Sequence, residues 1–191
     1  MTWSMQNDTH SSHIMKNVLI ISGHTDMADS VANKAIMAKL AELLPTSKAV
    51  YLDRLYPDFK INAQAEQEKL IWADIIILQF PVFWFSMPSL MHRWMEDTFL
   101  HGFSHGSTGD KLRGKKLLLS YTTGAPLEAL DFDAFFSGMK AACGFCGMEY
   151  AGSISTGAVS YAMRQEPGQM DAILSKAETH AQRVAQLISQ L

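Results

Sequence analysis

Three short segments of the sequence combine polar, aromatic and glycine residues in ways that suit ligand binding. GHTDMADS (23–30) carries His24 and Ser30, PVFWFS (81–86) carries three consecutive aromatic rings, and TTGAP (122–126) pairs two hydroxyls with a glycine. Each segment directly follows a run of apolar residues. The chemistry open to them is the binding of an anion, the stacking of a flat ring and the stabilisation of negative charge.

The first segment suits a phosphate group. His24, Ser30 and Asn33 stand where a strand leads into a helix, and free N–H groups at a helix start bind anions. The segment lacks both GxGxxG and GxxxxGK[ST], which argues against a Rossmann dinucleotide site or a nucleoside-triphosphate P-loop. The alternative is an ordinary helix cap at Ser30. Asp26 and Asp29 would oppose an anion unless their carboxylates point outward.

The other two segments suit a planar ring. The backbone groups of Val82–Phe85 are expected to be free of any sheet ladder, and Trp84 and Phe85 offer flat faces for stacking. The alternative is that the three rings only plug the core below the next helix. Thr122-Thr123-Gly124 offers hydroxyls and exposed N–H groups that can stabilise negative charge, or it is a plain turn.

The elements that must position these segments alternate along the chain. Apolar β-branched runs predict strands, and periodic stretches between them predict helices. Continuous apolar strands alternating with helices predict a doubly wound parallel sheet with helices on both faces. Ligands bind at the carboxyl ends of such strands, where all three segments fall. The expected strands are 18–22, 48–52, 74–80, 115–121 and 149–155, and the expected helices are 30–44, 63–73, 88–99, 127–146 and 169–191.

Composition narrows the class of protein. The 191 residues suit one domain, predicted over 16–191 after a flexible lead-in over 1–15. A net charge of −3 without a basic stripe argues against nucleic-acid binding. No apolar run approaches the roughly 20 residues that span a bilayer, and no signal-peptide pattern opens the chain. We therefore expect a cytoplasmic protein.

Neither cysteines nor histidines predict a further site. Cys143 and Cys146 spell C-x-x-C but close a predicted helix rather than open one, so we expect two buried thiols. His92, His101 and His105 do not have a zinc-binding spacing, and no metal site is predicted.

The segment QFPVFWFSMPSLMHRWMEDTF (79–99) resembles a family of known enzymes. Its pattern, QFP-x-x-W-[FY]-x-x-P-x-x-[LM]-x-x-W-x-[DE], is similar to that of NAD(P)H:quinone oxidoreductases with a flavodoxin-like fold. The likeness extends through most of residues 17–124, including LYPDF (55–59) and HGF (101–103). It is strongest to the smaller bacterial branch, which contains general-stress oxidoreductases and ancillary flavoproteins of glutathione-gated potassium efflux.

The resemblance implies a flavodoxin-like α/β fold with a five-stranded parallel sheet of order 2-1-3-4-5. It also implies a homodimer with a flavin at each subunit interface. The loop that covers the substrate falls on 103–107, with Phe103 and His105 as substrate contacts, and no catalytic side chain is assigned. The implied flavin contacts are His24, Ser30, Val31, Ala32, Asn33, Val82, Phe83, Trp84, Phe85, Thr122, Thr123, Gly124 and Ala125.

The implied activity is that of an NAD(P)H dehydrogenase (quinone). NAD(P)H would reduce the flavin, and a quinone or related acceptor would then take two electrons from it. FMN is expected, with FAD as the alternative, and the choice between NADH and NADPH stays open. Ala125-Pro126 departs from the family's glycine-rich continuation. Two other functions remain: a regulatory flavoprotein subunit of a membrane efflux system, and a one-electron carrier like flavodoxin.

Overall fold

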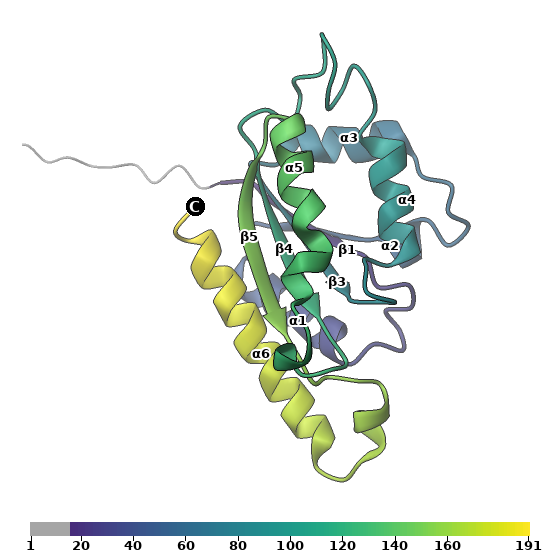
Figure 1. Ribbon diagram of the computed structural model, residues 1–191, viewed down its shortest axis with the longest axis vertical. Coiled ribbons are helices and arrows are strands. Elements are labelled where there is room, and N and C mark those ends of the chain that lie inside the picture. The colour runs from purple at the N-terminus through teal and green to yellow at the C-terminus, as the bar shows by residue number, and fades with distance from the viewer. Residues whose placement is uncertain (1–15) are drawn as a thin grey trace, which may run out of the picture.

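The computed structural model describes residues 16–191, which form an α/β structure around one parallel sheet (Figure 1). The strand order is β2-β1-β3-β4-β5, as expected for a flavodoxin-like fold. The predicted lead-in over 1–15 lies outside the described residues. The strands are β1 (Val18–Ser22), β2 (Lys48–Tyr51), β3 (Ile75–Pro81), β4 (Lys116–Thr122) and β5 (Glu149–Thr156).

The inner strands are buried on both faces, which explains why their sequences are mostly apolar. Every residue of β1 and β3 is buried. A parallel sheet needs crossover helices on its faces, and those helices exclude water from both sides of each inner strand. The register aligns Ser22 with Gln79 and Gln79 with Ser120, so a row of polar side chains crosses the sheet near its carboxyl end.

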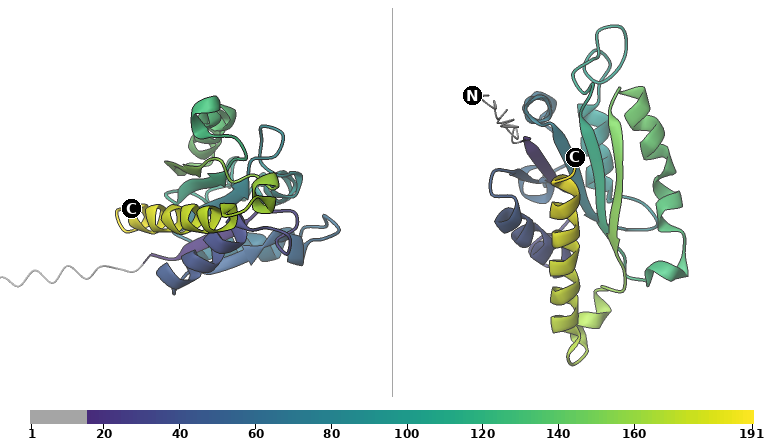
Figure 2. Two further views of the ribbon diagram at one scale, coloured as in Figure 1. Left: turned by 90° about the horizontal axis from the view of Figure 1, so that it is seen from below. Right: turned by 90° about the vertical axis from the view of Figure 1, so that its left-hand side faces the viewer.

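Helices cover both faces of the sheet (Figure 2). On one face α1 and α6 pack against each other and against β1, β3 and β4. The other helices pack on the opposite face, where Trp94 is fully buried. The helices are α1 (Ala32–Leu43), α2 (Leu52–Leu55), α3 (Ala63–Trp72), α4 (Ser89–Thr98), α5 (Ser137–Phe145) and α6 (Gln169–Ile188).

One predicted helix is wrong as a single element. The stretch 127–146 divides into short 3-10 helices η1 (Leu127–Ala129) and η2 (Phe132–Phe136), followed by α5. The cause is local: the Asp131 carboxylate accepts a hydrogen bond from Ala134 N–H and so begins a new helix there. A further 3-10 helix, η3 (Ala162–Gln165), lies in a stretch for which no element was predicted.

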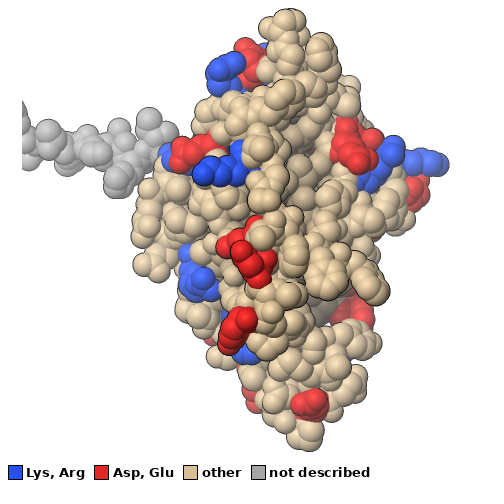
Figure 3. All heavy atoms as spheres, viewed as in Figure 1, with Lys and Arg blue, Asp and Glu red and all other residues tan. Residues whose placement is uncertain are grey.

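Charge on the molecular surface is mixed in sign. Figure 3 shows acidic and basic side chains interspersed on the face in view, without a continuous stripe of either. Within residues 16–191, no helix combines the length and the apolar character that crossing a membrane requires.

Candidate functional site

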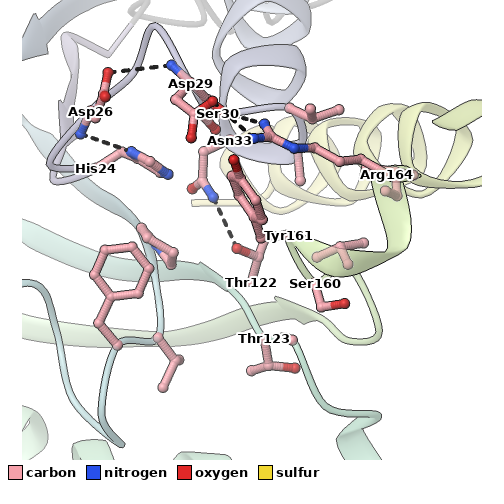
Figure 4. A pocket seen from close by; sticks show the side chains of 18 of the residues that line it. His24, Asp26, Asp29, Ser30, Asn33, Thr122, Thr123, Ser160, Tyr161 and Arg164 are labelled. Carbon is pink, nitrogen blue, oxygen red and sulfur yellow. Dashed lines mark hydrogen bonds and ion pairs between the residues drawn. The ribbon is translucent and has the colours of Figure 1, made fainter. Parts of the chain in front are cut away.

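A cavity of about 390 Å³ lies at the carboxyl ends of the central strands (Figure 4). Its walls come from four segments: the β1–α1 loop with the start of α1, the end of β3, the end of β4 with the loop after it, and the connection from β5 to α6 with the first turns of α6. The predicted residues that line it are His24, Ser30, Val31, Ala32, Asn33, Val82, Phe83, Thr122, Thr123 and Gly124.

The N-terminus of α1 presents unpaired backbone donors to this cavity. The N–H groups of Val31, Ala32 and Asn33 have no hydrogen-bond partner among the described residues, and all three residues line the cavity. The next N–H, that of Lys34, donates to Ser30 Oγ at 3.2 Å. Ser30 therefore stabilises the first turn, although the helix itself begins at Ala32. Successive free N–H groups at a helix start form an anion site.

His24 adds a neutral donor beside these N–H groups. Its Nδ1 accepts a hydrogen bond from Asp26 N–H at 3.1 Å, which leaves the proton on Nε2. Burial lowers the pKa of His24 and outweighs the opposite influence of Asp53, Asp26 and Asp29. The ring meets Phe83 edge to face, with centroids 5.8 Å apart.

The acidic residues of this loop are held by partners. Asp26 Oδ1 accepts from Asp29 N–H at 3.3 Å, and the Asp29 carboxylate forms an ion pair with Arg164 at 2.9 Å. Arg164 also lies over the ring of Tyr161, 3.4 Å from the ring centre to the guanidinium carbon. The repulsion that Asp29 would exert on an anion is thus offset by a cation from η3.

The aromatic segment forms an exposed, strained turn. Phe83 and Ser86 exchange two backbone hydrogen bonds of 3.0 Å, and the residues between them, Trp84 and Phe85, have φ of 47° and 63°. Bulky residues rarely adopt positive φ, and such strain concentrates at functional sites. Trp84 is 93% exposed and Phe85 56% exposed, so these two rings do not plug the core of this chain.

The expectation of a free backbone over Val82–Phe85 is only partly right. Val82 N–H donates to Thr122 carbonyl at 2.8 Å and extends the β3–β4 ladder, and Phe83 N–H is taken by the turn. The N–H groups of Trp84 and Phe85 have no partner in the described part of the chain. Neither Trp84 nor Phe85 lines the cavity, but the three residues before them, Pro81–Phe83, all do.

The last residue of β4, Thr122, offers one free hydroxyl at the cavity. Thr122 Oγ1 accepts from Asn33 Nδ2 at 2.9 Å, so its own hydrogen is available to the cavity. The Thr123 hydroxyl instead donates to Ala125 carbonyl at 2.7 Å. Ala125 is exposed and does not line the cavity, whereas Gly124 does, beside Ser160.

The two predicted substrate contacts lie elsewhere in this chain. Phe103 is 8% exposed and packs in the core of the α4 face. The His105 ring packs on Phe145 at the end of α5, 5.1 Å between centroids. Because α5 leads directly into the start of β5, this loop is at the amino ends of the strands, opposite the cavity. These residues would reach a ligand there only from a second subunit.

The cysteines behave as the sequence predicts. Both are buried, and burial raises the pKa of Cys143 to about 11 and also raises that of Cys146. Thiols with raised pKa values are poor nucleophiles. Among residues 16–191 the structure contains no cluster of three or more histidine, cysteine or acidic side chains that could hold a metal ion.

Sequence reasoning missed one wall of the cavity, which comes from the connection between β5 and α6. GAVSYAMRQ (157–165) follows the carboxyl end of β5, so the rule that pointed to the other three loops applied here as well. The segment has no recognisable motif to draw attention to it. The residues that it contributes are Val159, Ser160, Tyr161 and Arg164.

The sequence matches the model of one known protein family. Residues 16–182 match the family model described as "Flavodoxin-like fold". A curated relative, the glutathione-regulated potassium-efflux system ancillary protein KefF of Enterobacter sp. (strain 638), is 34% identical over 139 residues. That alignment covers 70% of this chain and 78% of the relative.

Three solved structures share the fold. General stress protein 14 of Treponema denticola, in complex with FMN, has a TM-score of 0.76 at 23% identity and covers 91% of this chain and 99% of that one. An NADPH-quinone reductase of P. pentosaceus has a TM-score of 0.69 at 23% identity, and the match covers 87% of this chain and 98% of the reductase. A chain described as a thermophilic tryptophan halogenase from Streptomycin violaceusniger has a TM-score of 0.73 at 27% identity. The match covers 86% of this chain and 96% of that one.

Proposed function

The chain belongs to the family with the flavodoxin-like fold, and from that membership we propose that it binds FMN and transfers electrons from NAD(P)H to a quinone or a related acceptor. One observation carries the proposal. The unpaired N–H groups of Val31–Asn33 open onto the same cavity as the strand-end loops of β3 and β4. An anion site and a site for a flat ring are therefore joined in one cavity.

The residues present fit the phosphate of a flavin. The N–H donors at the start of α1 and the Nε2–H of His24 all face the cavity without a competing acceptor in residues 16–191. A dianionic phosphate is stabilised by such donors and by the positive end of the helix dipole. The pairing of Asp29 with Arg164 compensates one of the two carboxylates that line the cavity.

The residues also fit an isoalloxazine ring. Thr122 supplies a hydroxyl hydrogen, and Gly124 leaves the adjoining backbone uncovered by a side chain. The turn at Trp84-Phe85 holds two unpaired N–H groups and two exposed rings next to the cavity wall. Phe85 packs edge to face on Phe135, with centroids 5.5 Å apart, but Trp84 is almost fully exposed. Contact of Trp84 with a ring or with a second subunit would account for this exposed, strained position.

FMN is favoured over FAD by the FMN complex of the Treponema denticola protein. The cavity contains one group of adjacent free N–H donors, those of Val31–Asn33, which is enough to bind a single phosphate.

Bound FMN would supply the two-electron chemistry, accepting hydride from a nicotinamide and passing it to the acceptor. The chain's own groups would hold the ring and stabilise negative charge on it when it is reduced. The reduced nicotinamide and the acceptor would use the same open face in turn, a ping-pong sequence. No side chain at the cavity needs to act as an acid or base, and none is assigned that role.

A homodimer completes the proposal. In one subunit Trp84 and Phe85 are exposed, and Phe103 and His105 are at the far end of the sheet. A second copy that covered the exposed turn would bury apolar surface and could bring its own 103–107 loop to the cavity. Light scattering on purified protein would report a dimer if this is correct.

The test of the function starts with the purified protein. Its visible spectrum and the mass of the ligand released on denaturation should identify FMN. Stopped-flow mixing with NADH or NADPH should bleach the flavin, and a quinone should restore the colour. A colourless protein that takes up neither FMN nor FAD after denaturation and refolding would contradict the proposal.

A second function is favoured by the curated relative. That protein is an ancillary protein of a potassium-efflux system, and it is 34% identical to this chain. In this alternative the protein binds flavin but acts mainly as a regulatory subunit of a membrane protein. Turnover with several quinones below about 0.1 per second, against roughly 10 per second for a typical enzyme, would favour it. Retention of the protein on a membrane fraction would add support.

A further inference from the structure

A continuous row of hydrogen-bonded polar side chains, most of them buried, links helix α6 to the cavity. It runs from Thr156 through His180, Ser120, Gln79 and Asn33 to Thr122, crossing three strands and two helices. Its inner members are closed to solvent, since His180, Gln79 and Ser120 are each 0% exposed. The phosphate site, the ring site and the dimer described above do not require such a row.

The two amide side chains give the row a direction. Gln79 Nε2 donates to Asn33 Oδ1 at 2.9 Å, and Asn33 Nδ2 donates to Thr122 Oγ1 at 2.9 Å. Gln79 Oε1 is therefore the atom that faces Ser120, 2.5 Å from its hydroxyl oxygen. An amide oxygen only accepts, so Ser120 must donate its hydrogen to Gln79.

The direction of these bonds fixes the proton on His180. Ser120 has a single hydrogen and has given it to Gln79, so at its 2.7 Å contact with His180 Nε2 it must accept. His180 Nε2 therefore carries the proton. A fully buried imidazole is neutral, which leaves Nδ1 bare to accept from the Thr156 hydroxyl at 2.9 Å.

At the other end of the row, this arrangement frees one hydrogen. Thr122 accepts from Asn33 and has no second protein partner within residues 16–191, so its O–H is free to donate to a ligand in the cavity. With the proton on His180 Nδ1 instead, each bond in the row could reverse. Thr122 would then donate to Asn33 and offer only lone pairs to a ligand.

We propose that His180 is a positioning residue whose Nε2–H tautomer sets Thr122 as a hydrogen-bond donor to an acceptor atom of the bound flavin. His180 acts at a distance, through Ser120, Gln79 and Asn33, and touches no ligand itself. The proposal rests on the proposed function for the identity of the ligand, but the direction of the row belongs to the protein alone.

The first test needs no ligand. In protein labelled with ¹⁵N-histidine and freed of flavin, long-range ¹H–¹⁵N correlation near pH 7 shows which ring nitrogen of His180 carries the hydrogen. His180 is assigned by the signal lost in His180→Gln. A proton on Nε2 is the expected result. A proton on Nδ1 would overturn the proposal, whether or not FMN binds.

The second test separates positioning from packing by FMN titration of the flavin-free protein. Thr122→Val should weaken FMN binding by roughly 3- to 10-fold, the range for one lost hydrogen bond. His180→Phe, which cannot donate to Ser120, should weaken it to a similar extent. In the double variant the losses should not add, because both act on the same bond. Fully additive losses would refute action through Thr122.

Two matched variants guard against a purely structural effect. His180→Gln places an amide N–H where Nε2–H was and should retain nearly the affinity of the native protein. Val184→Ala removes packing from the same buried face of α6 and should lower stability but leave FMN affinity unchanged. If native protein binds no FMN, the proposed function fails, while the imidazole measurement still decides the direction of the row.

Discussion

Arg164 binds Asp29 across 135 residues of sequence with two contacts, Nη1 to the backbone carbonyl at 2.8 Å and Nη2 to the carboxylate at 2.9 Å. The pair joins η3 to the loop before α1 (Figure 4). Exposed ion pairs add little to stability, and the Asp29 side chain is about half exposed. We therefore expect this ion pair to affect ligand binding more than stability, because it neutralises a carboxylate beside the N–H groups of α1.

Removing the cation should weaken FMN binding. Arg164→Gln leaves the Asp29 carboxylate uncompensated near the phosphate, and we expect a 5- to 20-fold loss of affinity, roughly 1–2 kcal/mol. Asp29→Asn alone should bind FMN at least as well as the native protein. The double variant should recover most of the loss, measured by titration of flavin-free protein at low salt. An equal loss in the single and double variants would show that Arg164 acts in another way.

A negative charge placed at the start of α1 should weaken the binding of FMN, which carries a phosphate, but not that of riboflavin, which lacks one. Val31 lines the cavity directly before the first helical residue. Val31→Asp favours the helix through its dipole, so the fold should persist, yet it opposes a phosphate at the same N–H groups. We expect FMN affinity to fall at least tenfold while riboflavin, which lacks the phosphate, binds as before.

Val31→Asn is the matched control for this experiment, because asparagine has nearly the shape of aspartate but carries no charge. Its FMN affinity should stay within about threefold of the native value. If aspartate and asparagine weaken FMN equally, or if riboflavin binding falls in parallel, the phosphate does not sit at these N–H groups.

The turn at Trp84 should store strain that glycine releases. Its φ of 47° is costly for any residue with a Cβ, by about 1 kcal/mol, but not for glycine. Trp84→Gly should therefore be more stable than Trp84→Ala by roughly 1 kcal/mol in urea denaturation of flavin-free protein. Both variants should bind FMN more weakly than the native protein. Equal stability of the two variants would argue against a strained turn, and unchanged FMN affinity would remove the ring from the site.

His180 should make the protein less stable as the pH falls below 6.5. Burial, followed by the charge of Arg183, lowers the pKa of His180 from 6.5 to about 3. Between those values the unfolded chain binds a proton that the folded one does not, so acid favours unfolding, and above pH 6.5 the effect vanishes. From pH 7.5 to pH 5 the native protein should lose about 2 kcal/mol more unfolding free energy than His180→Gln. Parallel pH profiles for the two proteins would show that folding does not lower the pKa of His180.

The sequence alone determined the fold and pointed to three of the segments that line the cavity. Strands that are almost entirely apolar, such as Ile75–Phe80, are typical of a parallel sheet covered on both faces. In such a sheet, ligands bind beside the loops at the carboxyl ends of the strands. His24, Asn33 and Thr122 were therefore identified, as was the unusual aromatic turn. Each of these signals is local, because it depends on neighbouring residues in the chain.

Tertiary structure decided everything that depends on distant residues meeting. No local pattern shows that Arg164 reaches Asp29, or that His180 is linked to Thr122 through the register of β3 and β4. Nor could spacing reveal that Val82 is held in the sheet ladder or that the 103–107 loop lies at the far end of the molecule. Hydrogen bonds and ion pairs act over a few ångströms of space, and only the folded chain brings these partners within that range.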